Sequence, residues 1–230
     1  MKDFITRKTA ILVDGGYYRK RAEAIWGKRK AEQRASELVA YCMLHITEPE
    51  DPRDLYRIFY YDCPPMSRIM KHPLDGTEID FTSLPMSKWS KKFYEELSTK
   101  MKIALRMGEL AESVASFNLK PDAMNSLLTK KISVDELSKD DFYVDVKQKG
   151  VDMRIGLDAA SISAGKSADQ IILIAGDSDF LPVAKAVRRN GGEFILDPMK
   201  QNPKKSLLEH VDYIETFTDR MYRNNGAIQI

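Results

Sequence analysis

The chain has 230 residues and a mass of 26.3 kDa, enough to bury a sizeable core, and we expect one domain over residues 1–230. Hydrophobic residues make up 43% and charged residues 30% of the chain, a balance that excludes a disordered or membrane-embedded protein. The formal net charge of +2 says little about partners, because a balanced total can hide a basic face.

Targeting signals and disulfides are not expected. No apolar run approaches the roughly 20 residues of a membrane-spanning helix, and the start, MKDFITRKTA, lacks the apolar stretch of a secretory signal. We therefore expect a cytoplasmic protein without a membrane partner. Cys42 and Cys63 offer neither a disulfide framework nor a zinc-ligand spacing, and we interpret them as reduced structural thiols.

The first part of the chain predicts a strand, a helix and a second strand. TAILVDGG is an apolar strand that ends at Asp14, and residues 32–46 carry Leu38, Cys42 and Ile46 at helical spacing. DLYRIFYYD, residues 54–62, is rich in the aromatic and branched residues of strands, and Cys-Pro-Pro ends it.

Residues 64–141 have a looser pattern. They predict a helix over 86–101, a strand in KIALRMGEL and a polar stretch over 111–140. We interpret 64–141 as an insertion or cap within the domain, whose role is left open between a substrate lid, a dimer contact and a partner site. A homo-oligomer also stays open, because FYY and the methionines of the insertion suit self-association.

Regular alternation returns in the last third. DFYVDVKQKG predicts a strand and a turn, and a helix follows from about Val151. Residues 170–175 predict a strand, a helix runs from Ser178 or Asp179 to Arg189, and residues 193–196 form the next strand, with HVDYIETFT as a further one. Strands that alternate with helices predict an α/β fold with a mainly parallel central sheet flanked by helices.

Four carboxylates are expected to meet at one edge of this sheet. Asp14 ends the first strand, Asp152 opens a helix, and Asp177 and Asp179 follow the strand at 170–175. Ligands of open α/β sheets collect at the carboxyl ends of the strands. Like charges this close raise one another's pKa, and Mg²⁺ or Mn²⁺ would relieve the repulsion. A hard-metal site of this kind suits phosphodiester hydrolysis.

Basic residues near these elements could bind a nucleic-acid backbone, although basic clusters are usually solvated faces. The candidates are Arg19, Lys20, Lys147, Lys149 and Arg188. Two acids stay open: Asp179 could be a helix N-cap, and Asp158 could reach the site from the second turn of its helix or lie on the surface.

Other catalytic systems have little support. His45, His72 and His210 do not group, which disfavours a histidine-based nucleophile. The Gly15-Gly16 pair lacks the spacing of a dinucleotide fingerprint and the lysine of a P-loop, so no nucleotide cofactor is indicated.

Four stretches, in chain order, resemble the NYN domain, a PIN-like nuclease group that includes the bacterial LabA-type proteins. They are ILVDGGY, IFYYDCPP, KGVDMRIGLD and LIAGDSDFLPVAKAVRRNGGEFIL. The resemblance implies a Rossmann-like PIN fold with a catalytic acidic site that uses Mg²⁺ or Mn²⁺ and most often acts on RNA. By motif, Asp14, Asp152 and Asp177 would hold the metal. Asp179 and Asp158 would support it, either as ligands through water or as carboxylates just beyond the ligands. Ser178 would donate hydrogen bonds that orient the acids.

One position departs from the family pattern. The family commonly has an asparagine two or three residues after the first aspartate, where this chain has Gly16 and Tyr17. Tyr17 could instead stack on a base, or it could pack at a helix start. The leading hypothesis is a metal-dependent ribonuclease. The alternatives are an RNA-binding regulatory module with the same pocket, and a phosphatase or nucleotide hydrolase.

Overall fold

The computed structural model describes residues 6–49 and 51–223. The chain forms two compact units: the first comprises Met1–Asp62, Lys92–Gly108 and Gly150–Ile230, and the second Cys63–Lys91 and Glu109–Lys149. Residues 1–5, part of the segment considered as a signal, lie outside the described residues. None of the helices in the described ranges is long and apolar enough to cross a membrane.

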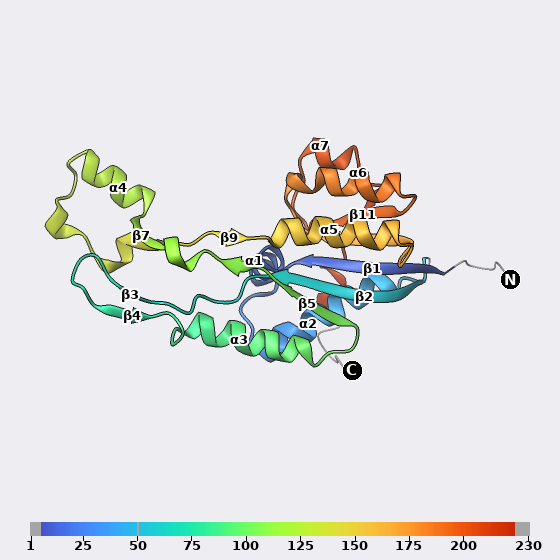
Figure 1. The fold of residues 1–230 in the computed structure, drawn as a ribbon, viewed down its shortest axis with the longest axis horizontal. Helices are drawn as coiled ribbons and strands as arrows, with labels where there is room; N and C mark the ends of the chain where they lie inside the picture. Colours follow the sequence, from blue (N-terminus) through green and yellow to red (C-terminus); the bar gives the residue numbers. More distant parts are fainter. Residues whose placement is uncertain (1–5, 50, 224–230) are drawn as a thin grey trace. The chain divides into compact units, whose positions relative to one another are not determined.

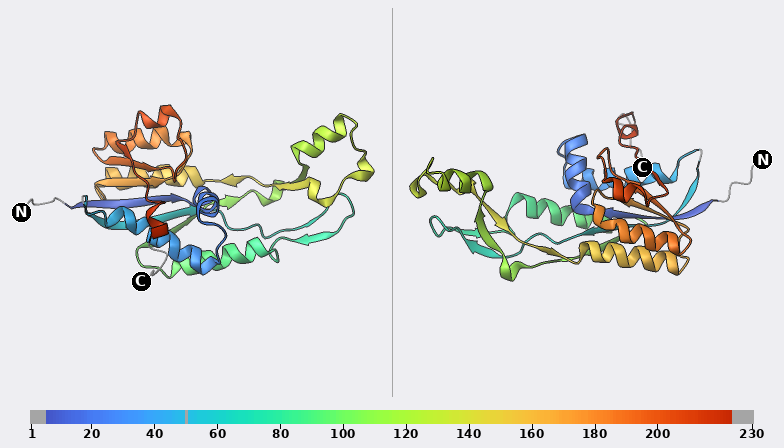
Figure 2. Two further views of the ribbon diagram at one scale, coloured as in Figure 1. Left: turned by 180° about the vertical axis from the view of Figure 1, so that it is seen from behind. Right: turned by 90° about the horizontal axis from the view of Figure 1, so that it is seen from above.

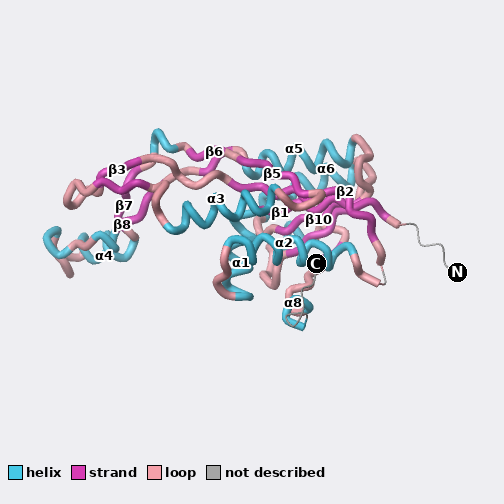
Figure 3. Tube along the Cα trace, turned by 90° about the horizontal axis from the view of Figure 1, so that it is seen from below, coloured by secondary structure: helices cyan, strands magenta, loops and turns pink. Residues whose placement is uncertain are grey.

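A six-stranded sheet forms the centre of the first unit. All its strands are parallel, in the order β12-β11-β10-β1-β2-β5. They are β1 (Arg7–Asp14), β2 (Arg53–Asp62), β5 (Ile103–Met107), β10 (Gln170–Ile174), β11 (Glu193–Asp197) and β12 (Tyr213–Ile214) (Figure 1). The predicted parallel α/β sheet is confirmed, and β10, β1 and β2 run side by side (Figure 3).

Helices cover both faces of this sheet. In chain order they are α1 (Gly15–Trp26), α2 (Ala31–Ile46), α3 (Pro85–Ser98), α5 (Val151–Ala164), α6 (Leu181–Arg189), α7 (Lys205–Leu208) and α8 (Arg220–Arg223). α5 and α6 lie side by side over one face, whereas α1 and α2 cover the other (Figure 2). From Lys92 onward α3 belongs to this unit, and its Phe93 ring packs 5.5 Å from the ring of Tyr60.

The core sits on the two faces of β1 and β10. Leu12 and Leu173 pack with Ile155 of α5 and Phe180, and none of these side chains is more than 1% exposed. Since side chains alternate along a strand, Asp14 follows Leu12 onto the same face at the carboxyl end of β1. The core thus fixes which way the first candidate acid points.

α1 fills a stretch for which the sequence predicts no separate element. Its charged residues interrupt the apolar pattern, yet Gly15, Tyr18, Ala22 and Trp26 are buried at helical spacing. Gly15 is required at its start, because a Cβ there would lie 2.5 Å from the Tyr60 ring and 2.6 Å from the carbonyl oxygen of Tyr61. The close approach of α1 to β2 holds Asp14 where the strand becomes a helix.

The second unit contains three short antiparallel strand pairs, one α-helix of its own and the first turns of α3 up to Lys91. The pairs are β3 (Ile69–Lys71) with β4 (Glu78–Asp80), β6 (Glu109–Leu110) with β9 (Gln148–Lys149), and β7 (Ser116–Leu119) with β8 (Phe142–Asp145), and the helix is α4 (Pro121–Leu128). The ring of His72 packs 4.9 Å from Phe117 and 5.1 Å from Phe142.

The structure refines the expected boundaries. The strand predicted in KIALRMGEL divides at Gly108 into β5 and β6, so the segment 64–141 contributes β5 to the central sheet. The helix expected from Ser178 begins as a short 3-10 turn, η4 (Ser178–Phe180), before α6. Cys42 and Cys63 are both buried, and neither forms a disulfide.

Candidate active site

Asp14 is the most constrained of the candidate acids. It ends β1 and caps α1, where its Oδ1 accepts a hydrogen bond of 3.1 Å from the backbone N–H of Tyr17. Burial raises its pKa to about 6; the Tyr17 N–H opposes that rise, and the charges of Asp152 and Asp62 add to it. Asp14 is therefore a carboxyl whose ionised form a nearby cation would stabilise.

Asp152 is the second residue of α5 and lies in its first turn, two residues after Gly150 at the helix N-cap. Its pKa is raised by partial burial and then by the charges of Asp177 and Asp179. Because Asp152 also raises the pKa of Asp14, it is coupled to acids on both sides. The four acids that the sequence predicts to converge are thus brought within electrostatic reach of one another.

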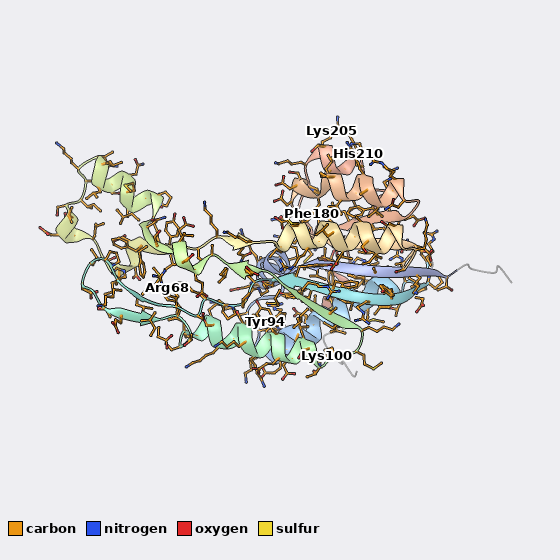
Figure 4. All side chains as sticks on the ribbon, viewed as in Figure 1. Arg68, Tyr94, Lys100, Phe180, Lys205 and His210 are labelled. Atoms are coloured by element: carbon orange, nitrogen blue, oxygen red, sulfur yellow. The ribbon has the colours of Figure 1, made fainter. Side chains whose placement is uncertain are left out.

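Asp177, not Asp179, is the capping residue of the GDSD turn. Its Oδ1 accepts a hydrogen bond of 3.0 Å from the N–H of Asp179 and caps η4. Asp179 lies in the first turn that follows, so the N-cap interpretation of Asp179 is wrong. Phe180, 1% exposed, anchors the turn to the core beside α5 (Figure 4).

Tyr17 connects the start of α1 to the turn after β10. A Cβ on Gly176 would lie 2.3 Å from a ring carbon of Tyr17, so the ring packs directly on the glycine backbone. The Tyr17 hydroxyl donates a 2.5 Å hydrogen bond to the carbonyl of Pro198, and burial raises its pKa to about 12. The ring therefore has the packing role that was the alternative to base stacking.

Asp62 is an acid that the sequence analysis missed. It ends β2 beside Asp14 on β1, is 1% exposed, and accepts hydrogen bonds from Arg19 at 3.0 Å and from the Tyr60 hydroxyl at 3.1 Å. Its charge raises the pKa of Asp14. The signal was present, because Asp62 ends a predicted strand just as Asp14 does.

Asp158 has partners of its own. Its Oδ2 accepts a hydrogen bond of 2.8 Å from the Tyr61 hydroxyl and one of 3.0 Å from Nε of Arg106, which ion-pairs with it. It is not among the principal carboxylates that raise the pKa of Asp14 or Asp152. The structure therefore places Asp158 on the sheet face beside β2 and β5.

The predicted substrate-binding residues differ in their surroundings. Arg19 is paired with Asp62, whereas Lys20 is exposed on α1 and Ser178 is half-buried in η4. Lys147 and Lys149 belong to the second unit, where both are exposed. Arg188 pairs with Asp212 at 3.1 Å on α6.

The family comparison identifies the fold group. The model of the NYN domain matches residues 79–215, more than half of the chain. The chain belongs to the NYN domain family. This family is part of the PIN-like nuclease superfamily, and the resemblance seen in the motifs is thereby confirmed. The match includes Asp152, Asp177 and Asp179, whereas Asp14 and Asp62 precede it.

A solved protein of unknown function from Vibrio parahaemolyticus is similar to this NYN protein along most of its length. The two chains are 16% identical, the similarity covers 93% of this chain and 94% of the other, and the TM-score is 0.46. At that TM-score the similarity carries no argument about the site. No curated protein matches the chain.

The donor chemistry of the acidic cluster fits a hard divalent cation. Within residues 6–49 and 51–221, no three His, Cys, Asp or Glu side chains are placed as a ready-made metal-ligand group. Mg²⁺, however, keeps several waters and is commonly bound through one or two carboxylates together with substrate phosphates. Asp14, Asp152 and Asp177 offer carboxylate oxygens alone, the ligand type that Mg²⁺ and Mn²⁺ prefer.

Proposed function

We propose that this NYN protein is a metal-dependent ribonuclease that hydrolyses RNA phosphodiester bonds. Asp14, Asp152 and Asp177 would hold Mg²⁺ or Mn²⁺, with Asp179 in support. One observation carries the proposal: burial raises the pKa of Asp14 and of Asp152, and the charge of Asp152 adds to the first rise as those of Asp177 and Asp179 add to the second. Acids from three distant segments thus form one electrostatic unit, and an unneutralised cluster of this kind is unfavourable.

The chain's own groups would orient this site. The backbone amides of Tyr17 and Gly16 hydrogen-bond Asp14, and the amide of Asp179 holds Asp177. A bound divalent ion would lower the pKa of a coordinated water and stabilise charge on the phosphate oxygens. Lys20 and Ser178 would contact the RNA backbone, since a lysine neutralises phosphate charge and a hydroxyl can donate to a phosphate oxygen.

RNA is proposed as the partner because family membership and site chemistry agree. The family is a nuclease group, and a carboxylate site with open metal positions suits an in-line attack on phosphorus. A cytoplasmic location would give the enzyme access to RNA, and we keep it as part of the proposal.

Cleavage of a 5′-labelled single-stranded RNA in Mg²⁺, Mn²⁺ or EDTA tests the proposal. Asp177→Asn should abolish cleavage while the circular dichroism spectrum stays unchanged. Asp54→Asn is the matched control, because Asp54 is an exposed aspartate at the opposite end of β2 from Asp62. It should cleave at the wild-type rate.

Two other results would replace the proposal. RNA that is bound but never cut, by wild type and Asp177→Asn alike, would indicate a regulatory RNA-binding module. Consumption of a small phosphate ester while polymer RNA stays intact would indicate a phosphatase or nucleotide hydrolase.

A further inference from the structure

A pocket of about 410 Å³ lies at the carboxyl ends of β11 and β12. It is lined by Pro198, Lys200, Gln201, Asn202, Pro203, Leu208, Ile214 and Thr216. This volume is within the range of pockets that hold small organic ligands. None of these lining residues belongs to the acidic cluster, so the proposed metal site leaves the pocket without a function.

The lining combines an apolar surface with polar groups. Pro198, Pro203, Leu208 and Ile214 supply the apolar surface, and Ile214 is 45% exposed although it is a large aliphatic side chain. Gln201 and Asn202 supply amides that both donate and accept hydrogen bonds. A nucleobase has the complementary chemistry, with two apolar faces and an edge of donors and acceptors.

The pocket and the acidic site share a wall. α7, which contributes Leu208, packs against η4, the turn that carries Ser178 and Asp179. On the other side, Tyr17 packs on Gly176 and donates its hydroxyl to the carbonyl of Pro198. An RNA strand with its phosphate at the acids would therefore have the pocket as its neighbour.

The loop that forms the pocket is held in a restricted backbone shape. Met199 and Lys200 have φ angles of 43° and 64°, in the left-handed region that non-glycine residues rarely adopt. Asp197 accepts a 2.8 Å hydrogen bond from the Met199 amide, and Arg21 donates to the Met199 carbonyl at 3.1 and 2.7 Å. Such strain persists only where the surroundings fix it, and it is frequent at binding sites.

Positive charge follows the pocket loop along the chain. Lys204 and Lys205 follow the loop and are exposed, and Lys205 extends from α7 (Figure 4). Lys200 is paired with Asp219. Two exposed lysines close in sequence to an amide-lined apolar pocket suit a nucleotide, whose phosphates flank its base.

We propose that this pocket binds one unpaired nucleobase of the RNA strand whose phosphate lies at Asp14, Asp152 and Asp177. The inference rests on the proposed ribonuclease function and adds a preference for single-stranded RNA to it. A base can enter such a pocket only when it is unstacked and splayed out, which a duplex does not allow.

Binding of a fluorescent 12-nucleotide unstructured RNA in EDTA, where no cleavage occurs, tests the pocket. The variants are Ile214→Glu and Asn202→Ala, the second lying in an exposed loop where the fold tolerates it. Met101→Glu is the matched control, because Met101 is 88% exposed and does not line the pocket. We expect Ile214→Glu to raise the Kd about tenfold, because one apolar contact face is lost. Met101→Glu should keep the Kd of the wild type.

A scan with a single abasic nucleotide at each position assigns the contact. At one position, the abasic nucleotide should weaken RNA binding to the wild type. It should have no further effect on binding to Ile214→Glu, because the pocket of that variant is already blocked. Unchanged Kd values for both pocket variants and a flat abasic scan would overturn the pocket, even if Asp177→Asn still abolished cleavage. No RNA binding by the wild type in EDTA would overturn the pocket alone, because the proposed ribonuclease holds the RNA phosphate through a metal ion that EDTA removes.

Discussion

The ring of Tyr17 occupies the space that a side chain at residue 176 would need. A Cβ there would lie 2.3 Å from the ring, and the Tyr17 hydroxyl is bonded to Pro198. Tyr17 also donates its amide to Asp14. One residue thus fixes the first acid, the turn before Asp177 and the loop after β11 in a single arrangement.

Gly176→Ala should disturb this arrangement. The added methyl must displace the Tyr17 ring or the turn, and overpacking of this kind destabilises by about 1–3 kcal/mol. We expect lower stability in urea unfolding and a reduced cleavage rate. Tyr17→Phe keeps the ring and loses only the hydrogen bond to Pro198, so its stability should fall by about 1 kcal/mol with cleavage largely kept. Equal stability of Gly176→Ala and wild type would contradict the contact.

Asp152→Asn should stabilise the protein without metal and inactivate it. Asp152 is coupled to Asp14, Asp177 and Asp179, and removal of its charge relieves their repulsion. Because Asp152 is exposed to solvent, the gain should be below about 1 kcal/mol. Thermal unfolding in EDTA should show a higher Tm than wild type, whereas Mn²⁺ should raise the Tm of the wild type more than that of the variant. A lower Tm in EDTA would argue against charge repulsion.

The Arg19–Asp62 pair should be structural. Asp62 is 1% exposed, so Arg19→Ala would leave a buried carboxylate without its ion-pair partner, a change that typically destabilises by about 3–5 kcal/mol. The double variant Arg19→Leu with Asp62→Leu should recover much of that loss. Urea unfolding of both variants checks this prediction. If Arg19→Ala were as stable as the wild type, the ion pair would not be structural and Arg19 would again be a candidate for substrate binding.

A buried network around His45 should make stability depend on pH. His45 bonds to Asp197 at 2.8 Å and to Glu215 at 2.9 Å. Burial alone would lower the pKa of His45, but both hydrogen bonds raise it above its usual 6.5. The resulting stabilisation is full below pH 6.5 and is lost as pH rises through the folded-state value.

The contribution of Glu215 to stability depends on pH in the opposite direction from that of His45. Burial acts to raise its pKa, but His45 and Arg53 hold it below the usual 4.5, so its stabilisation is full above pH 4.5 and is lost as pH falls through the folded-state value. Urea unfolding from pH 4 to 9 should therefore show greatest stability between these limits. His45→Gln should flatten the decline above pH 6.5, and an unchanged decline would assign it to another group.

The sequence predicts the parallel sheet and the convergence of acids for a clear physical reason. Apolar runs that end in Asp14 and in the turn of Asp177 carry both the strand signal and the chemistry in one place. The sequence analysis missed Asp62 because the aromatic residues of its strand were interpreted only as a packing signal, and the acid at the end of the strand was not considered. The same rule, applied to every strand, would have found it.

Other features depend on contacts that sequence spacing does not encode. Tyr17 meets Gly176 and Pro198 across more than 150 residues, and Asp158 of α5 contacts Tyr61 of β2 and Arg106 of β5. The pocket of Gln201 and Ile214 forms only when β11 and β12 lie side by side. Such partners become visible in three dimensions alone.

The central claim is that one acidic cluster holds the divalent ion used to cleave RNA. The most direct measurement is an Mn²⁺ titration in which bound Mn²⁺, detected by electron paramagnetic resonance, and the RNA cleavage rate are followed together. We predict that rate rises in proportion to bound Mn²⁺ for the wild type and for Asp54→Asn, and that Asp152→Asn loses both. Cleavage that persists in EDTA, or an Asp152→Asn titration identical to that of the wild type, would contradict the account.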